Sequence, residues 1–351
     1  MKHLINTEAL LAQKTADKSV GSYALVVGYK DREWVLTTPD VDLDTYFDAA
    51  SLGKVFPTAT LVLKAIDEGR LSFEDTIEKF FPNAPNDKKK ITVKHLLTHT
   101  SGMRRKEFPE NVADRGRDSV AEFILNVPLA YETGTKYTYC CTGIVLLGFI
   151  VEKVFGMTLD VAFDQLLCKP LGLTRSRYNL PSDEPNAINC HHDLRVTDIQ
   201  RDDHNVQMMR GIPAGPGGNY CTAGDLQKFV KAVIRMDEHL YSREMFALAE
   251  KNCTEGLDVD DIRRGIENHA MGYTYVNQNC MQARDLFPDG SIGHDGWTGQ
   301  SFYLNRDMNL YVIFLSDANR CTVKKYGKSN YDEVCELRAE IHRAIKKDLQ
   351  L

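Results

Sequence analysis

Hydrophobic and polar positions alternate near both ends of the chain, a pattern typical of β-strands. Near the N-terminus, residues 22–29 (SYALVVGY) and 33–39 (EWVLTTP) predict a hairpin with its turn at KDR. Near the C-terminus, residues 291–305 (SIGHDGWTGQSFYLN) and 310–317 (LYVIFLSD) predict a second hairpin, joined by RDMN. The stretch YFDAA, residues 46–50, predicts one further short strand.

Between these strands, apolar residues recur at the spacing of helices. Residues 54–67, 142–156 and 330–349 each predict a helix, and Thr222 with Asp225 forms a capping pair at the start of another. Strands at both ends and helices in the middle predict an α+β fold. We expect an antiparallel sheet built from both termini and flanked by helices, with an inserted and mostly helical lobe.

The same pattern predicts where the two lobes begin and end. Residues 1–75 and 225–351 are expected to form the sheet-containing lobe, and residues 76–224 the mostly helical lobe. Within the helical lobe, residues 104–136 and 176–212 are polar and irregular, so they are predicted to be mainly loops.

Composition and charge exclude several classes of protein. The 351 residues are 43% hydrophobic and 26% charged, with a net charge of -6. The densest basic run, Lys88–Lys90, is predicted to be a solvated loop, so no nucleic-acid partner is expected. No apolar stretch approaches the ~18 residues of a membrane span, and the N-terminus does not resemble a signal peptide. The nine cysteines are an odd number and include no C-x-x-C pair, so we expect reduced thiols. Together these features predict a cytoplasmic protein with no membrane partner.

Two pairs of histidines have spacings that occur in metal sites. His95 and His99 are four residues apart, and His191 is followed directly by His192. Neither pair has the glutamate of H-E-x-x-H, and no cysteine cluster lies nearby in the sequence. We interpret both pairs as groups that form hydrogen bonds in loops. No metal and no cofactor are expected, and the sequence leaves the oligomeric state open.

The candidate chemistry begins at Ser51 and Lys54, which are three residues apart where the strand YFDAA meets a helix. A serine hydroxyl is a weak nucleophile until a neighbouring group removes its proton, and a lysine one turn away is able to do so. Backbone N–H groups at a helix start also favour a developing negative charge. Tyr139 lies at another loop-to-helix junction, and residues 293–299 (GHDGWTG) lie along a predicted strand.

These segments, in this order, resemble the penicillin-recognising serine hydrolases, which include class C β-lactamases, DD-peptidases, related esterases and D-amino-acid peptidases. Ser51 and Lys54 match the family's S-x-x-K motif, and residues 293–305 match its third motif in the H-x-G form. The segments ITVKHLLTHTSGM, GTKYTYCCTGIVLLGFIVEKVFGM and CTAGDLQKF resemble family segments as well. The resemblance covers roughly residues 45–320 and implies a β-lactamase/transpeptidase-like fold with an active-site cleft between the two lobes.

The resemblance also implies a role for each matching residue. Ser51 would attack a carbonyl group and form an acyl-enzyme, Lys54 would accept its proton as a neutral amine, and Tyr139 would carry a second proton. The backbone N–H groups of Ser51 and Trp297 would form the oxyanion hole. The remaining roles concern the substrate: His294 would polarise the site or orient the substrate, and the substrate would contact Cys141, Gly296, Trp297 and Asn205.

The chain departs from the family pattern at three points. The family's second motif is usually Tyr-x-Asn, and here Cys141 replaces the asparagine. Because a thiol is a weak hydrogen-bond donor and acceptor, the site should lose preference for acyl groups that carry an amide. Pro57 lies in the predicted helix after Ser51, so we expect a tight first turn or a kink there. Pro216 stands where relatives often have a histidine.

These observations predict a cofactor-free serine hydrolase that cleaves small esters or amides through a Ser51 acyl-enzyme, with a preference for esters. Two alternatives remain open. One is a β-lactamase or a D-amino-acid-specific peptidase or DD-peptidase. The other is a catalytically silent relative that binds a ligand, which the Cys141 replacement and the expected kink at Pro57 would support.

Overall fold

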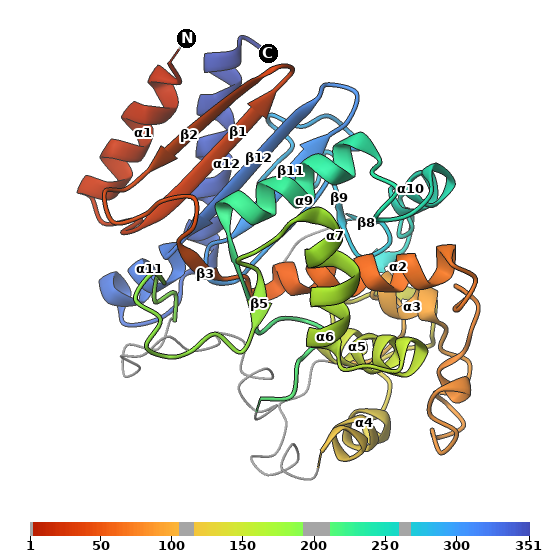
Figure 1. Cartoon of the computed structure of the whole chain (residues 1–351). Helices are drawn as coiled ribbons and strands as arrows, with labels where there is room; N and C mark the ends of the chain where they lie inside the picture. Colours follow the sequence, from red (N-terminus) through yellow and green to blue (C-terminus); the bar gives the residue numbers. More distant parts are fainter. Residues whose placement is uncertain (1–2, 105–115, 192–210, 260–267) are drawn as a thin grey trace.

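The computed structural model describes residues 3–104, 116–191, 211–259 and 268–351. A large antiparallel sheet with helices on both faces occupies one side of the molecule, and a group of helices lies below it (Figure 1). The sheet is built from residues 23–37 and 268–316, so the predicted antiparallel sheet from both ends of the chain is confirmed. The predicted boundaries of the two lobes stay a prediction.

The large sheet has seven strands in the order β2-β1-β12-β11-β10-β9-β8. Each neighbouring pair is antiparallel, and the central pair aligns Val26 with Ile313. The first predicted hairpin is therefore present, and the second is present with a first strand shorter than predicted. The strands span Arg32–Thr37 (β2), Tyr23–Tyr29 (β1), Leu310–Ser316 (β12), Ser301–Asn305 (β11), Ile292–Asp295 (β10), Thr274–Tyr275 (β9) and Asn268–His269 (β8).

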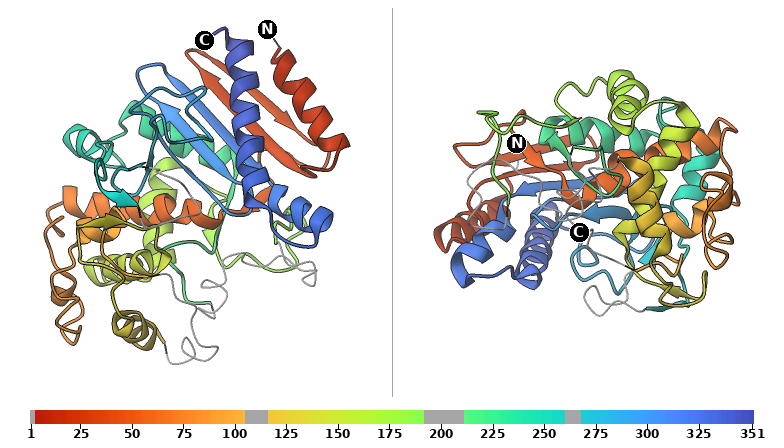
Figure 2. Two further views of the ribbon diagram at one scale, coloured as in Figure 1. Left: turned by 180° about the vertical axis from the view of Figure 1, so that it is seen from behind. Right: turned by 90° about the horizontal axis from the view of Figure 1, so that it is seen from below.

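Successive side chains of β1 pack into two different hydrophobic clusters. Ala24 and Val26 contact the cluster that includes α9 (Ala223–Arg235), whereas Leu25 and Val27 contact the cluster on the opposite face. The opposite face is covered by α1 (Ile5–Ala16) and α12 (Tyr331–Leu349), which lie side by side (Figure 2). Because alternate residues of a strand point to opposite faces, a strand covered on both sides is hydrophobic throughout.

The remaining helices lie mostly in the lower part of the molecule and around α2 (Thr60–Asp67) (Figure 1). Helix α5 is buried from Cys141 to Val151, as expected for an apolar helix packed against several others. These helices are α3 (Val93–Leu97), α4 (Arg117–Asn126), α5 (Cys141–Phe155), α6 (Leu159–Phe163), α7 (Lys169–Leu171) and α10 (Arg243–Ala249). Short turns of 3-10 or π type are Ala50–Lys54, Val55–Ala59, Ile77–Lys79 and Asp164–Cys168.

Two small sheets connect distant parts of the chain. Strand β3 (Tyr46–Asp48) pairs with β6 (Asn219–Thr222), which also pairs with β5 (Arg177–Tyr178). Strand β4 (Lys136–Tyr137) runs parallel to β7 (Asp258–Val259). The first of these sheets matters for the site, because it holds the residues before Ser51 against the segment that precedes α9.

Several expectations from the sequence are corrected by the structure. Helices α1 and α11 (Ala318–Tyr326) were not predicted, and α4 lies within a stretch predicted to be a loop. The segment 291–305 forms two strands around a turn at 296–300, where one strand had been expected. Lys88 is buried beside Asp87 and is not a solvated side chain.

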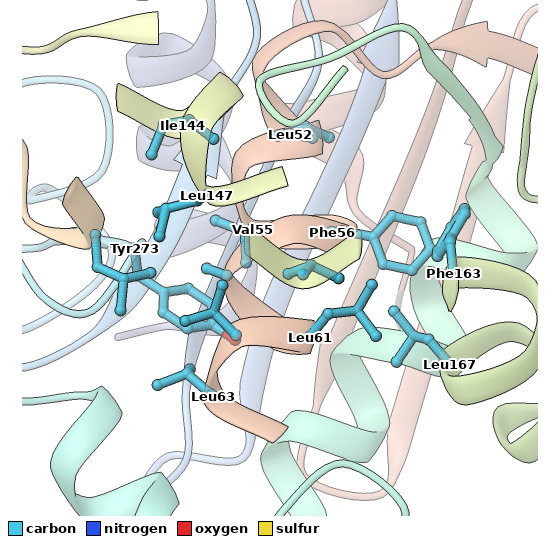
Figure 3. Packing of buried hydrophobic residues seen from close by; sticks show 14 of the residues in the cluster. Leu52, Val55, Phe56, Leu61, Leu63, Ile144, Leu147, Phe163, Leu167 and Tyr273 are labelled. Carbon is cyan, nitrogen blue, oxygen red and sulfur yellow. The ribbon is translucent and has the colours of Figure 1, made fainter. Parts of the chain in front are cut away.

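The predicted kink near Pro57 is present, and it bends the chain into the hydrophobic core. Phe56 has non-helical dihedral angles, φ -113° and ψ 89°, and its ring lies 5.0 Å from that of Phe163. Figure 3 shows Phe56 pointing towards Phe163, while Val55 points towards Leu147. The Asn219 side chain donates to the Phe56 carbonyl at 2.9 Å, which satisfies a group that the kink removes from the helix ladder. The kink thus separates the 3-10 turn with Ser51 from α2.

Helices of membrane-spanning length and hydrophobicity do not occur among the described residues. The longest helix among the described residues, α12, has 19 residues but is amphipathic, and its charged residues other than Arg338 are at least partly exposed.

Candidate active site

Ser51 lies at the start of a tight turn that follows β3. The 3-10 helix Ala50–Lys54 begins with Ala50 at a φ of 47°, and its N–H donates to the Asp48 carboxylate at 2.8 Å. In a 3-10 helix, side chains three residues apart lie one above the other. The spacing of Ser51 and Lys54 therefore matches this turn better than the α-helix that the sequence predicted.

The two side chains of the S-x-x-K motif lie at hydrogen-bond distance. Lys54 Nζ is 2.8 Å from Ser51 Oγ and donates to the Pro216 carbonyl at 3.3 Å. Lys54 is completely buried, whereas Ser51 keeps 8% of its surface exposed. Burial disfavours the charged form of an amine, so this geometry fits a lysine that accepts the serine proton.

Gly53 allows the turn to approach the segment 215–219 very closely. A Cβ atom at this position would lie 2.8 Å from Gly217 Cα and 2.6 Å from Asn219 Oδ1. Such distances are too short for a real Cβ, and one of the atoms belongs to the backbone. The glycine is therefore required by the approach that brings the Pro216 carbonyl to Lys54.

We predict that Gly53→Ala lowers the free energy of unfolding by about 1–3 kcal/mol, because the added methyl group overpacks this contact. Denaturant-induced unfolding measures the change. Gly143→Ala is the matched control: its Cβ would meet Leu96 at an ordinary 3.4 Å, and alanine is a better helix former than glycine. Equal stability of both variants would contradict the close approach at Gly53.

Tyr139 lies next to the lysine, as its predicted role requires. Lys54 Nζ is 4.9 Å from the centre of the Tyr139 ring, and the Tyr139 hydroxyl oxygen is buried. Once Lys54 has taken up the serine proton, its charge would lie beside this ring and favour proton transfer from the tyrosine. The residue precedes α5, whose first residue is Cys141.

Two histidines that the sequence did not assign to the site surround Tyr139. The ring of His99 lies 4.7 Å from that of Tyr139, and His99 Nδ1 accepts a hydrogen bond from the Cys140 N–H at 3.2 Å. His269 is completely buried, with its ring 5.0 Å from His99 and 6.3 Å from Tyr139. The residues around His269 in the sequence do not indicate that it lies near Tyr139, because it belongs to β8, which is distant from Tyr139 in the sequence. His99 had been interpreted as a loop residue that forms hydrogen bonds, which agrees with its contact to Cys140.

His294 completes this buried group from the large sheet. Its ring lies 6.1 Å from Tyr139 and 6.3 Å from His269, and its Nδ1 is 2.8 Å from the Asp295 carbonyl. A carbonyl oxygen only accepts, so Nδ1 carries the proton in this contact. The structure therefore brings together the four predicted catalytic side chains, which are Ser51, Lys54, Tyr139 and His294.

The turn 296–300 follows His294 and packs against the residues before Ser51. A Cβ at Gly296 would lie 3.1 Å from Ala50 Cβ, which is a packing reason for this glycine. One face of the half-buried Trp297 indole stacks on Tyr331, with ring centres 4.6 Å apart, so only its remaining surface is available to a substrate. The predicted roles of Gly296 and Trp297 towards a substrate stay predictions.

The two cysteines after Tyr139 are both buried and form no disulfide. Burial raises the pKa of the Cys140 thiol, whose sulfur is 2.9 Å from the Thr142 hydroxyl. Cys140 therefore stays a neutral thiol. Cys141 occupies the first position of α5, and its predicted contact with the substrate stays a prediction. Asn205, the remaining predicted contact, lies outside the described residues.

Within the described ranges, no group of three or more His, Cys, Asp or Glu side chains has the geometry of a metal site. The buried ring of His269 packs edge to face against His99, with ring centres 5.0 Å apart, and against His294, with ring centres 6.3 Å apart. The chemistry that the site supports is proton transfer and nucleophilic attack by Ser51.

Comparison with known proteins finds relatives that match most of the chain. The family model described as Beta-lactamase matches residues 7–326. An N-acetylmuramyl-L-alanine amidase of Bacillus subtilis (strain 168) is 33% identical over 337 residues, which cover 86% of this chain and 74% of the relative.

Two solved structures share the fold at lower sequence identity. One is a hydrolase with promiscuous acyltransferase activity, with a TM-score of 0.77 and 16% identity over 97% of both chains. The other is a β-lactamase/D-alanine carboxypeptidase from Pseudomonas syringae, with a TM-score of 0.74 and 19% identity, covering 96% of this chain and 97% of the other. The fold class expected from the sequence is confirmed by these likenesses.

Proposed function

The chain belongs to the β-lactamase family of serine hydrolases, and from this premise we propose that it cleaves small esters or amides through an acyl-enzyme on Ser51. The observation that carries the proposal is the distance of 2.8 Å between Lys54 Nζ and Ser51 Oγ, with the amine fully buried. A buried neutral amine at this distance is a competent base for the hydroxyl. The reaction needs no cofactor.

In the proposed acylation, the Lys54 lone pair takes the Ser51 proton while Oγ bonds to the substrate's carbonyl carbon. The carbonyl π electrons move to its oxygen, and the N–H groups of Ser51 and Trp297 donate to the resulting oxyanion. When the carbonyl re-forms, the bond to the leaving alcohol or amine breaks. Tyr139, 4.9 Å from Lys54 by ring centre, passes the proton from the amine to the leaving group.

Deacylation reverses these roles with water as the nucleophile. Water gives a proton to the Tyr139–Lys54 pair and attacks the ester carbonyl of the acyl-enzyme. The acid product leaves, and the proton returns to Ser51 Oγ. His294 has its Nδ1 bonded to the Asp295 carbonyl, and its ring centre lies 6.1 Å from that of Tyr139. We assign to His294 the orientation of the substrate or of the Tyr139 hydroxyl.

The preference for esters rests on Cys141. A thiol forms only weak hydrogen bonds, so an acyl group that carries an amide would leave that amide poorly paired in the site. Small esters without such a group lose nothing by this replacement. The nine cysteines all lie within the described residues and form no disulfide, which supports a proposed location in a reducing compartment such as the cytoplasm.

Amide cleavage is the second candidate, and one observation favours it. The Bacillus subtilis relative of 33% identity is named an amidase. A second relative, from Escherichia coli (strain K12) and 27% identical, is named a putative D-alanyl-D-alanine carboxypeptidase, so the amide or peptide would be one of a D-amino acid. Its recognition would depend on groups other than the missing asparagine. A β-lactam belongs to the same alternative, since its ring is a reactive amide.

A panel of three substrate types distinguishes these candidates. Hydrolysis of p-nitrophenyl esters, D-amino-acid p-nitroanilides and a chromogenic cephalosporin is measured as kcat/KM on the same preparation. We expect the highest kcat/KM for a short-chain ester. Faster turnover of the cephalosporin or of a D-amino-acid anilide would overturn the ester preference and leave the serine hydrolase mechanism intact.

We predict that Cys141→Asn shifts the preference towards acyl groups with an amide. The asparagine side chain should raise kcat/KM for substrates with an amide-bearing acyl group, relative to kcat/KM for substrates without one, by roughly 10-fold. This is the scale of one well-placed hydrogen bond. The ratio of kcat/KM values within the panel measures it. Cys140→Ser, at the neighbouring position, serves as the control; an equal shift in both variants would exclude a specific role for residue 141.

We predict that Tyr139→Phe lowers kcat for esters by about 10²–10³-fold, because the leaving group and the attacking water lose their proton carrier. The ring remains and keeps its contacts with His99, so the fold should be retained. Burst kinetics with a p-nitrophenyl ester measures both half-reactions. Unchanged rates in both phases would remove Tyr139 from the mechanism.

A further inference from the structure

Arg338, on the C-terminal helix α12, lies directly behind the turn 296–300. Its side chain is 1% exposed, and Nη2 donates to the Gly296 carbonyl at 2.6 Å and to the Gln300 carbonyl at 3.0 Å. These two carbonyls mark the beginning and the end of the turn. A buried arginine that is bonded to backbone carbonyls is uncommon, because desolvation of its charge is costly.

Other buried groups keep the guanidinium in one orientation. Nη1 donates to Gln282 Oε1 at 2.8 Å and to the Tyr331 hydroxyl at 3.2 Å, and it lies 3.8 Å from the Asp295 carboxylate. Asp295 accepts hydrogen bonds from Gln282 and Tyr331 in turn. Burial opposes the charge of Arg338, but Tyr331 and Asp295 outweigh it and hold the pKa of the guanidinium above its ordinary value. The arginine is therefore charged and rigidly oriented.

The opposite side of the turn is tied to the segment that carries Ser51. The Gln300 side chain donates to the Asp48 carbonyl at 2.7 Å, and the Thr298 hydroxyl donates to the same oxygen at 3.4 Å. Asp48 in turn accepts the Ala50 N–H through its carboxylate at 2.8 Å. The turn is thus bonded to α12 on one side and to the residues before Ser51 on the other.

The Gly296 carbonyl and the Trp297 N–H belong to the same peptide group. In a trans peptide the C=O and N–H bonds point in opposite directions, so a donor fixed on the oxygen also fixes the direction of the N–H. A charged donor on the oxygen withdraws electrons from the peptide group and strengthens the N–H as a donor. Arg338 therefore acts on the atom group that would hold the oxyanion.

We propose that Arg338 is a positioning residue for the oxyanion hole, which orients and polarises the Gly296–Trp297 peptide group from the C-terminal helix. This inference rests on the proposed function, since it assumes that the Trp297 N–H donates to the oxyanion. A guanidinium suits the task because its planar fork reaches two carbonyls and two side chains at once. An ammonium group cannot do this.

Arg338→Lys tests the inference, with Arg343→Lys as the matched control. Both residues lie on α12, but Arg343 is 42% exposed and pairs with Asp285 on the surface. The lysine at 338 keeps a cation near Asp295 and loses the fork. For each variant, kcat/KM for a p-nitrophenyl ester is divided by the fraction of active sites in the burst, and the Ki of phenylboronic acid, which forms a tetrahedral adduct with serine, is measured.

We expect Arg338→Lys to lower kcat/KM per active site by roughly 10- to 100-fold, below the 10²–10³-fold loss that removal of a whole oxyanion donor causes. The Ki of phenylboronic acid should rise by the same factor as kcat/KM falls, because both quantities depend on the stability of the tetrahedral state. KM should be nearly unchanged. A purely structural role would lower the burst amplitude and the melting temperature, and leave the rate per active site equal to that of Arg343→Lys. That result would overturn the inference.

If Arg338→Lys does not fold, the double variant Arg338→Met with Asp295→Asn removes both buried charges, and the same comparison with Arg343→Lys applies to it. If wild-type protein and Arg343→Lys both lack turnover and boronate binding at Ser51, the proposed function fails and the inference falls with it. Normal wild-type turnover without any effect at position 338 would overturn the inference alone.

Discussion

Ser51→Ala abolishes covalent labelling of the protein by a fluorophosphonate probe and lowers ester hydrolysis by at least about 10⁴-fold. The reason is that the alanine has no oxygen to attack the carbonyl, and the remaining groups offer only binding and oxyanion stabilisation. Lys54 would keep its hydrogen bond to the Pro216 carbonyl, and the small 8%-exposed side chain contributes little to packing. The fold should therefore persist. Labelling is read by intact mass, and hydrolysis by release of p-nitrophenol.

The same experiment separates the enzyme from a catalytically silent relative. A silent ligand-binding protein would show no labelling even as wild type. Ser101→Ala is a suitable control, because this buried serine lies in the segment before α4 and is not among the proposed catalytic groups. Labelling of wild type and of Ser101→Ala, but not of Ser51→Ala, supports the acyl-enzyme. Equal labelling of all three proteins would show that another residue reacts.

Lys54→Met lowers the rate of acylation by about 10²–10⁴-fold, the range that loss of a general base causes. Methionine has nearly the length of lysine and no charge, so it fills the buried space without acting as a base. Lys54→Met removes only one partner of two buried contacts, so the Ser51 hydroxyl and the Pro216 carbonyl each lose a hydrogen bond. We therefore expect the free energy of unfolding to fall by about 1–3 kcal/mol while the fold is retained.

Stopped-flow measurement of the burst gives the acylation rate, and denaturant-induced unfolding gives the stability. Lys64→Met is the control, because Lys64 lies on α2 at the surface and pairs with Glu68 at 3.3 Å. An acylation rate within a few-fold of the wild type would contradict the assignment of Lys54 as the base. A large loss of stability with normal acylation by the folded fraction would show that the lysine serves the fold alone.

Where the relevant contacts are local, the sequence was sufficient. The β1–β2 hairpin follows from the alternation of residues 22–39, and α5 follows from its continuous apolar run. The contact between Ser51 and Lys54 is local as well, since residues three apart in a tight turn meet whatever surrounds them. The resemblance to the family, through the order of its motifs along the chain, led us to predict that Tyr139 and the third motif belong to the same site.

Where the local pattern is weak, the predictions of secondary structure from the sequence were wrong. The turn at 296–300 interrupts a segment that reads as one strand, because its course depends on bonds to Asp48 and Arg338 from distant elements. Helix α1 is only weakly amphipathic, and it is held by packing on α12 and by bonds from Asn6 and Thr7 to Asp348. Such elements are selected by tertiary contacts, which override local preference.

By itself, the sequence predicted the hairpins near the two ends of the chain and the contact between Ser51 and Lys54, because hydrophobic period and short spacing act within a few residues. The tertiary structure alone decided that His99 and His269 surround Tyr139, that Gly53 is pressed against Gly217, and that Arg338 supports the turn carrying Trp297. These contacts join residues about 40 to 160 positions apart. Which distant groups meet is set by how the sheet and helices pack, and no local pattern in one chain records that choice.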